Sequence, residues 1–447
     1  MADPALVRLR AMLRGTLVLP GDDGYDDARA IWNAAFDRRP AAVVRCTDAT
    51  DVARAVEVAR TCGLAIAVRG GGHSFAGKST CEGGLVIDCS GMKAVEVDPL
   101  RRVARAGAGC TLGDFDGATQ GLGLATTMGT VSATGIAGLT LGGGLGWLMG
   151  RHGLACDNLV AAEVVTADGR VVRASAEERP DLLWGLRGGG GNFGVVTRFE
   201  YRLHPLRTVL GGAVTYPTTH ARDVFRLYRD LTAEAPDELT AHAGIQPLAT
   251  GLGFGIAACW SGEVAAGERF LAPLRRVGPP LDDTIGPKPY LEMQSLLTPP
   301  PVRVGSYARS SFLRALDDAT IDALAARVTA PSPSISVFFI EHVHGRVSAG
   351  TPADSAFNHR GPGYSFAALS LWSDPAESDG CATWVREFFA EMAPLLTSGV
   401  YANYLGEEGE RRVRAAYGPA WDRLVTLKRA YDPDNVFRLN QNVSPDG

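Results

Sequence analysis

The sequence predicts an α+β protein with two main domains, on three observations. The chain has 447 residues, which is too many for a single hydrophobic core. Clusters of glycine recur before about residue 205, among short strand patterns and turns. From 208 to about 397 the clusters disappear, and alternating strand patterns are separated by helical ones. This second pattern is typical of an antiparallel sheet covered by helices on one face.

Composition excludes several classes of partner. The chain is 46% hydrophobic and 21% charged, with a formal net charge of -5 and no long run of one sign. This balance argues against nucleic acid or an anionic membrane as the main partner. No apolar run approaches the ~18 residues of a membrane span, and no cationic-then-apolar leader opens the sequence. The eight cysteines form no C-x-x-C pair, so we expect buried free thiols in a cytoplasmic protein.

Hydrophobic periodicity and turn residues place the expected elements. Asp168-Gly169 between two β-branched runs predicts a hairpin, and three glycines between 107 and 113 predict turns. We expect strands at 41–45, 64–68, 85–88, 94–98, 102–106, 161–167, 170–174, 195–203, 212–216, 240–246, 254–260, 336–342 and 364–372. We expect helices at 220–232, 264–275, 318–328, 383–395, 408–417 and 421–430. Another helix is expected between the N-cap candidates Asp48, Thr50 and Asp51 and a C-cap at Gly63, since 52, 56 and 59 are apolar at helical spacing.

The first glycine cluster, 70–72, follows a compact strand–helix–strand unit. Consecutive glycines let the backbone approach another molecule closely, and successive N–H groups in such a turn can hold a phosphate. Arg69 would add positive charge, and His73 presents an imidazole nitrogen at the end of the loop. The same stretch also fits an ordinary glycine-rich turn with an exposed histidine.

Two more glycine clusters lie within 130–150 and 188–194. The first of these has almost no charge, so we expect its backbone to pack closely against something flat or anionic. The other contains G-x-G-x-x-G, but a dinucleotide-binding fold requires a helix after that motif, and 195–203 alternates as a strand. The sequence therefore argues against a Rossmann fold.

Parts of the sequence also fit three rival sites or functions. Residues 72–76 approach the G-x-S-x-G elbow of serine hydrolases, but the glycine-rich residues after Ser74 form no helix, as that elbow requires. His342 and His344 alternate on one strand and could bind a metal, but no carboxylate-rich or cysteine partner lies at a recognisable spacing, and a surface strand face explains them better. No metal is predicted. A cofactor-binding module without catalysis stays open.

The motifs together resemble the vanillyl-alcohol-oxidase superfamily, and within it the berberine-bridge-enzyme-like FAD-linked oxidases. The resemblance covers about 35–205 and 395–445. It implies a PCMH-type FAD-binding domain of two subdomains at 35–206, a substrate domain at 207–397, and a C-terminal segment at 398–447 that returns to the FAD domain. It is carried by Arg69-Gly70-Gly71-Gly72-His73-Ser74, Gly142-Gly143-Gly144-Leu145-Gly146, residues 181–194, Tyr401-x-Asn403-Tyr404 and Asn440-Gln441-Asn442.

The resemblance implies FAD as cofactor, bonded covalently between His73 and the flavin 8α carbon. Some relatives carry a second link through a cysteine. The matching position here is Val131, and Cys156 lies after the glycine cluster, so a single link is expected. Sugar-oxidising relatives often have tyrosine where this chain has Phe75, which weakens a carbohydrate assignment. Further FAD-binding residues implied by the resemblance are Arg69, Gly70, Gly71, Gly72, Ser74, Gly77, Gly135, Gly138, Gly142, Gly143, Val196, Asn440 and Asn442.

The expected activity is hydride removal from a C–H of a small alcohol, amine, sugar or secondary metabolite, with oxygen as acceptor and hydrogen peroxide as product. Such a reaction needs a base for the O–H or N–H proton. The resemblance points to Tyr404, with Tyr401 beside it, and to Asp354 as acidic support. Half-buried aromatics and a solvated loop aspartate are the plainer alternatives. A dehydrogenase with another acceptor also stays open, and the sequence predicts no oligomeric state.

Overall fold

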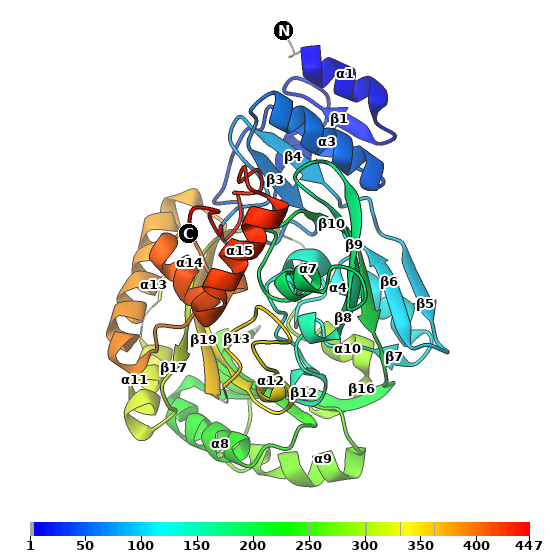
Figure 1. Cartoon of the computed structure of the whole chain (residues 1–447). Helices are drawn as coiled ribbons and strands as arrows, with labels where there is room; N and C mark the ends of the chain where they lie inside the picture. The colour runs from blue at the N-terminus through cyan, green and yellow to red at the C-terminus, as the bar shows by residue number, and fades with distance from the viewer. Residues whose placement is uncertain (1–3, 249–250, 300–301, 331, 362) are drawn as a thin grey trace.

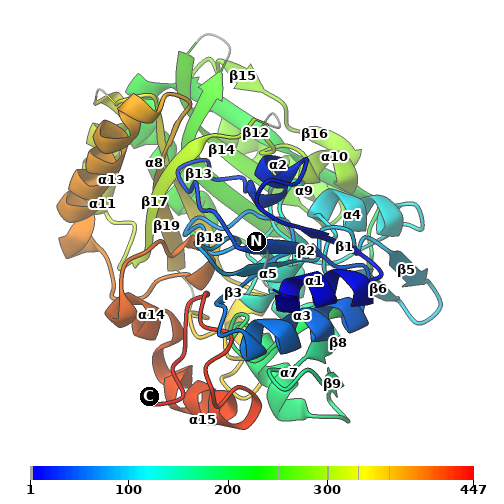
Figure 2. The ribbon, with the colours of Figure 1, turned by 90° about the horizontal axis from the view of Figure 1, so that it is seen from above.

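The computed structural model describes residues 4–248, 251–299, 302–330, 332–361 and 363–447. Figures 1 and 2 show three layers of structure: a small sheet near the N-terminus, a second sheet beside it, and a large sheet carrying its own helices. The α+β class is as predicted. Among the described residues, no helix is both long and apolar enough to cross a membrane.

The first sheet contains the predicted strand–helix–strand unit. Strand β2 runs parallel to β4, which runs parallel to β3. The N-terminal strand β1 pairs with β2, so residues before 35 also belong to this part of the fold. Asp48 begins the crossover helix α3 by accepting a hydrogen bond from the Asp51 N–H. The elements are α1 (Pro4–Met12), β1 (Thr16–Val18), α2 (Tyr25–Arg29), β2 (Ala42–Arg45), α3 (Ala49–Thr61), β3 (Ile66–Arg69) and β4 (Leu85–Asp88).

The second sheet has five antiparallel strands in the order β5-β6-β10-β8-β9. The hairpin at Asp168-Gly169 is confirmed, and the strand after the third glycine cluster is β10, as the argument against a Rossmann fold requires. The strands are β5 (Val95–Asp98), β6 (Val103–Gly107), β8 (Leu159–Val165), β9 (Val171–Ser175) and β10 (Val195–Arg202), with the small pair β7 (Leu124–Ala125) and β11 (His204–Pro205).

The turns expected from the glycines between 107 and 113 are present at 108–109, but Gly113 lies in a helix. Thr111 and Asp114 form a reciprocal capping box that begins α4, and this cap outweighs the glycines within the helix. Buried apolar contacts support the other short helices of this region, whose four to seven residues could not hold a helix by propensity alone. These helices are α4 (Leu112–Gln120), α5 (Ile136–Leu141), α6 (Met149–His152) and α7 (Pro180–Leu186).

The third sheet is antiparallel, as predicted for the second domain, and has eight strands where five were expected. Helices α8, α11 and α13 cover one face through a shared apolar core, and the opposite face is turned toward the glycine-rich half. The strands are β12 (Thr208–Pro217), β13 (Leu239–Leu248), β14 (Gly251–Trp260), β15 (Asp282–Asp283), β16 (Gly286–Pro289), β17 (Gly305–Leu313), β18 (Ile335–Val343) and β19 (Gly363–Trp372). The helices are α8 (Ala221–Ala233), α9 (Val264–Leu271), α10 (Tyr290–Gln294), α11 (Asp318–Thr329), α12 (Arg346–Ala349) and α13 (Ser378–Met392).

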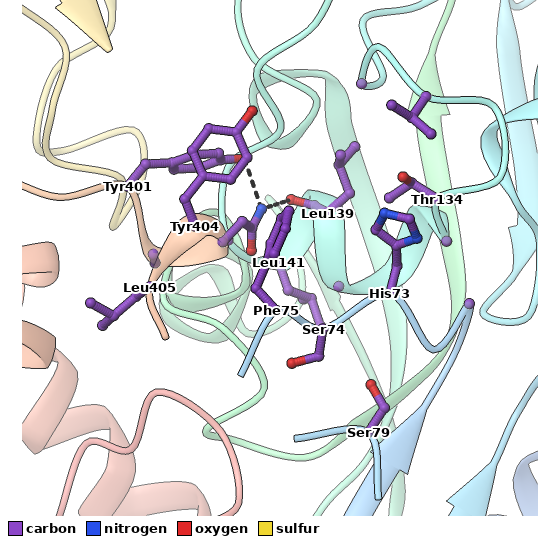
Figure 3. Close-up of a pocket in the computed structure, with 18 of the residues that line it drawn as sticks. His73, Ser74, Phe75, Ser79, Thr134, Leu139, Leu141, Tyr401, Tyr404 and Leu405 are labelled. Atoms are coloured by element: carbon purple, nitrogen blue, oxygen red, sulfur yellow. Dashed lines mark hydrogen bonds between the residues drawn. The ribbon is translucent and has the colours of Figure 1, made fainter. Parts of the chain in front are cut away.

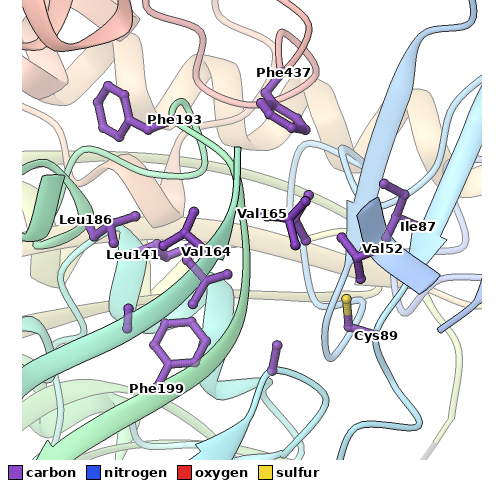
Figure 4. Close-up of a cluster of buried hydrophobic side chains, with 14 of the residues drawn as sticks. Val52, Ile87, Cys89, Leu141, Val164, Val165, Leu186, Phe193, Phe199 and Phe437 are labelled. Carbon is purple, nitrogen blue, oxygen red and sulfur yellow. The ribbon is translucent and has the colours of Figure 1, made fainter. Parts of the chain in front are cut away.

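The C-terminal segment, with α14 (Glu410–Tyr417) and α15 (Trp421–Tyr431), packs back into the core of the glycine-rich half. Figure 4 shows Phe437 facing the same cluster as Val165 and Ile87. Behind it, the fully buried Lys428 donates to Asp432 and to the carbonyls of Asn192 and Phe437. Lys428 thus links the C-terminal segment to the third glycine cluster through the Asn192 carbonyl.

Candidate active site

A cavity of about 560 Å³ lies between the glycine clusters, the inner face of the third sheet and the C-terminal segment. This volume falls within the range of about 300–1,000 Å³ that is usual for ligand sites. Segments far apart in the sequence meet there. Of the residues singled out from the sequence, the lining contains Gly70, Gly71, Gly72, His73, Ser74, Gly135, Gly138, Gly142, Val196, Tyr401, Tyr404 and Asn440.

The first glycine loop offers unused hydrogen-bond donors to this cavity. In the part of the chain that the structure describes, the N–H groups of residues 71–74 donate no hydrogen bond. Gly71 packs on the backbone of Gly135, where an added Cβ would lie 2.5 Å from the Gly135 Cα. Gly138 faces open space. Bare backbone with free N–H groups suits a pyrophosphate, so these residues fit FAD.

Four glycine-loop and C-terminal candidates lie outside the lining. The guanidinium of Arg69 is paired with the buried Asp88 at 2.5 Å, so its charge is neutralised within the protein rather than presented to a phosphate. Gly77 packs on the ring of Phe36, which excludes any side chain there. Gly143 and Asn442 likewise lie outside the lining, Gly143 because its backbone packs against Phe357 and Tyr401.

His73 lines the cavity with a neutral ring. The imidazole stacks on Trp32 with ring centroids 4.3 Å apart. Burial lowers the pKa of His73 to about 4, so one ring nitrogen keeps its lone pair at neutral pH. Val131 and Phe75 line the same cavity, whereas Cys156 is buried outside it.

Tyr401 is held by three donors. Its hydroxyl oxygen accepts hydrogen bonds from the N–H groups of Gly144 (2.8 Å) and Leu145 (3.4 Å) and from the Asn403 amide (2.7 Å). The Asn403 amide also donates to the Leu139 carbonyl, as Figure 3 shows. Burial raises the pKa of Tyr401. This phenol is therefore a neutral anchor between the tyrosine turn and the second glycine cluster.

Tyr404 donates its hydroxyl hydrogen to Glu341 Oε1 at 3.2 Å. Burial raises the pKa of Glu341 to about 7. Burial and the nearby Glu341 charge raise the pKa of Tyr404 well above its usual value. An isolated Tyr404 phenolate would need a stabilising cation or donors, and the phenol instead faces a carboxylate. Tyr404 and Glu341 therefore form a hydrogen-bonded pair in which the carboxylate is the acceptor.

Glu341 was missed from the sequence. Glu341 lies on β18, directly after the apolar run that ends at Ile340 and directly before His342. From the sequence alone, His342 and His344 on this strand could form a metal-binding pair. Those two rings stack on each other with centroids 4.3 Å apart. Among the described residues, no group of three or more His, Cys, Asp or Glu could hold a metal. Strand alternation could have identified Glu341, because it is an acidic residue on the same face of β18 as Val337 and Phe339.

Asp354 is not brought to the tyrosines. Its exposed carboxylate accepts hydrogen bonds from the N–H (2.9 Å) and hydroxyl (2.7 Å) of Thr351, and these bonds lower its pKa. It lies outside the cavity lining. The structure thus gives Asp354 a loop-capping position, and Glu341 occupies the place beside Tyr404 that Asp354 was expected to take.

The fold and site define a flavin-dependent oxidoreductase, and comparisons with known proteins agree. Residues 40–175 match the family described as FAD binding domain, and 400–444 match berberine and berberine like. The chain is 33% identical over 461 residues to (R)-6-hydroxynicotine oxidase of Paenarthrobacter nicotinovorans, covering 97% of this chain and 98% of that protein. An FAD-linked oxidoreductase of Dictyostelium discoideum is 30% identical over 439 residues, covering 97% and 95%.

Solved structures give the same assignment. The crystal structure of 6-hydroxy-D-nicotine oxidase from Arthrobacter nicotinovorans matches with a TM-score of 0.90 and 30% identity, over 97% of this chain and 98% of that one. Berberine bridge enzyme shares the fold, with a TM-score of 0.87 at 18% identity. The chain belongs to the family of FAD-linked oxidoreductases that carry the berberine-like C-terminal segment, and it is an enzyme of that class.

Proposed function

We propose that this protein is an FAD-dependent oxidase that removes a hydride from a C–H of a small alcohol, amine, sugar or secondary metabolite. We further propose oxygen as the electron acceptor, with hydrogen peroxide as product. The observation that carries the proposal is the buried Tyr404–Glu341 pair, because it places a proton acceptor in the same cavity as the glycine loops that fit FAD.

The free N–H groups of residues 71–74 would hold the pyrophosphate, and the glycine backbones near Gly135 and Gly138 leave room for the cofactor. When bound, FAD supplies the oxidising chemistry by accepting the hydride. We propose a single covalent link at His73. The neutral imidazole in the lining and the valine at position 131 support this choice.

The chain's own residues move the proton. The substrate O–H or N–H gives its proton to the Tyr404 oxygen while Tyr404 passes its own proton to Glu341 Oε1. A base with a pKa near the working pH is the most effective general base, and burial raises the pKa of Glu341 to about 7. Tyr401, fixed by Gly144 and Asn403, holds the turn that presents Tyr404.

A substrate-free experiment tests the oxidase proposal. Acid precipitation of the purified protein should leave the yellow flavin in the pellet. The native protein, photoreduced without oxygen, should regain its oxidised spectrum when air is admitted and release equimolar peroxide. A colourless protein would reject the flavoprotein function. Slow recovery in air with rapid recovery by an added quinone would instead establish a dehydrogenase.

A further inference from the structure

The inner face of the third sheet has a polar end and an apolar remainder. Strand alternation sets this face: Phe338 and Ile340 point into the helix-covered core, so their neighbours on β18 point toward the cavity. His242 pairs directly across strands with Glu341, and Gly244 pairs with Phe339. The side chains on this face of the lining are His242, Gln246, Ala257, Val337, Phe339, Glu341, Leu369 and Leu371.

The polar end has hydrogen-bonding positions that the protein leaves open. His242 Nε2 lies 3.9 Å from Glu341 Oε1, which already accepts the hydrogen bond of Tyr404. Among the described residues, His242 Nε2 and Glu341 Oε2 have no partner at ordinary hydrogen-bond geometry, although the two side chains are only 5% and 1% exposed. The Ser365 hydroxyl, directly across strands from Glu341 on β19, is near enough to lower the pKa of that carboxyl. Buried polar atoms are rarely left unpaired, because an unmade hydrogen bond leaves the cost of removing the atom from water uncompensated. Two such atoms beside the base indicate a place for a ligand group.

The ring of His242 is fixed rather than free to turn away. It stacks on Trp147 with centroids 4.7 Å apart and an interplanar angle of 20°. Burial lowers the pKa of His242 to about 3, so the ring is neutral at physiological pH. Its Nε2 therefore offers one hydrogen bond without adding charge to the cavity.

The remainder of this face is mostly hydrocarbon, and the Gln246 amide oxygen already accepts a hydrogen bond from the Thr215 hydroxyl at 2.8 Å. Phe339, Val337, Leu369 and Leu371 are hydrocarbon, and Phe75 approaches from the glycine loop with its ring edge-on to Tyr404, 6.0 Å between centroids. Among the described residues that the sheet contributes to the lining, Glu341 is the sole carboxylate and none is lysine or arginine. A sugar chain would bury many hydroxyls against this surface without partners.

We propose that the substrate is a compact, mainly apolar ring compound with a single hydroxyl or amino group on the carbon to be oxidised. This inference rests on the proposed function and narrows its substrate class. The ring packs against Phe339 and Leu369, and the polar group lies at the open positions of His242 and Glu341 beside Tyr404. His242 is thus a specificity residue that recognises the reacting group, and oligosaccharides fall outside the class.

Three probes test the proposal on the flavin-loaded protein: 1-phenylethanol, ethylbenzene (which lacks the hydroxyl) and cellobiose. Anaerobic titration reads the change in the flavin spectrum, or its bleaching, as occupancy. The alcohol should bind about tenfold or more tightly than ethylbenzene, as expected for one well-placed hydrogen bond of about 1.4 kcal/mol, and cellobiose should bind weakest. Equal binding of alcohol and ethylbenzene, tighter binding of cellobiose, or no response to the alcohol up to its solubility would overturn the proposal.

Variants of His242 separate recognition from folding. His242→Phe keeps a ring against Trp147 and removes the nitrogen, so the preference for alcohol over ethylbenzene should collapse toward one while ethylbenzene affinity is kept. His242→Gln restores a donor and should recover part of the preference. Ile340→Val, on the opposite face of the same strand, is the matched control and should leave the preference intact. An unchanged preference in His242→Phe would refute the role of His242.

These outcomes are distinct from a failure of the oxidase proposal. Flavin retention and reoxidation in air are measured without any probe, so they report on the proposed function alone. A protein that holds flavin and reacts with oxygen but fails the probe comparison would keep its function and lose only this substrate class.

Discussion

The two sides of the cavity are built by opposite means. The glycine-rich half presents backbone: residues 71–74 leave their N–H groups free, and Gly71 meets Gly135 with no side chain between them. The third sheet presents side chains from a strand face, where Glu341 and His242 stand among hydrocarbon. Backbone contacts suit a cofactor whose shape does not vary. The side chains on a strand face can be substituted to fit a different substrate without changing the fold. Substitutions in the glycine-rich half should therefore affect cofactor binding, and substitutions on the sheet face should affect the reaction of the substrate.

The largest effect is expected from Gly71→Ala. An added Cβ would meet the backbone of Gly135 at 2.5 Å, which neither loop can relieve by moving a side chain. The purified variant should contain no flavin by its visible spectrum. Gly117→Ala is the control, because no atom lies within 4 Å of a Cβ there and the exposed helix position should gain about 0.5–1 kcal/mol of stability. Normal flavin content in Gly71→Ala would contradict the claim that bare backbone at the glycine loop is required to bind the cofactor.

The next effect concerns the base. Glu341→Gln removes the proton acceptor but keeps its shape, so flavin reduction by substrate should slow by about 10²–10⁴-fold with FAD still attached. Tyr404→Phe should slow it within the same range, because it removes the group that passes the proton. Stopped-flow reduction of both variants measures this. Wild-type rates in either variant would remove that residue from the mechanism.

The pH profile should follow the carboxylate. Among the described residues, the titratable groups that interact with Glu341 are His242, Tyr228, Tyr401 and Tyr404. All four are neutral around pH 7, since the pKa of each tyrosine is raised and that of His242 is lowered to about 3. The reduction rate should therefore rise with pH through about 7, as Glu341 loses its proton, and then level off. Glu341→Gln should flatten the profile. A profile that falls across this range would contradict the assignment.

A smaller effect is expected at Tyr401. Tyr401→Phe removes the acceptor of the Gly144 and Leu145 N–H groups and leaves the Asn403 amide with the Leu139 carbonyl, which should lower the free energy of unfolding by about 1–3 kcal/mol. The midpoint of thermal unfolding measures this loss, and flavin reduction should slow less than in Tyr404→Phe. A larger loss of rate than in Tyr404→Phe would reverse the roles of the two tyrosines.

The smallest effect is expected at Asp354. Among the described residues, its carboxylate accepts hydrogen bonds from Thr351 of its own exposed loop, so Asp354→Ala should leave the reduction rate within about twofold and cost about 1 kcal/mol or less of stability. Steady-state turnover is sufficient to test this. A drop of tenfold or more would place Asp354 in the reaction after all.

The same contrast explains what could be predicted from the sequence. Glycine at 70–72 is required by backbone geometry, so the motif itself marks the loop, and twelve of the seventeen residues singled out lie in the lining. Arg69 was misjudged because its partner Asp88 is 19 residues away on a neighbouring strand. Glu341 was missed because its role depends on the register of β18 against β13 and on the return of Tyr404 from the C-terminal segment, and neither has a local sequence signal.

Strand β17 was missed for a similar reason. Its central residues, Arg309 to Ser311, are polar, and the strand is recognisable only through its pairing with β19. The sequence did not predict the helices after Thr111, because glycine has a low helix propensity and these helices are short. In the folded chain, the capping box of α4 and buried apolar contacts stabilise them.

The central claim is that the glycine loop holds FAD and fixes it through His73. Intact-mass measurement under denaturing conditions tests this most directly, followed by peptide mapping. The account predicts one added FAD per chain, located on the peptide that contains His73, and none on His73→Ala. An unmodified mass with all flavin released into solution, or flavin found on another residue, would contradict it.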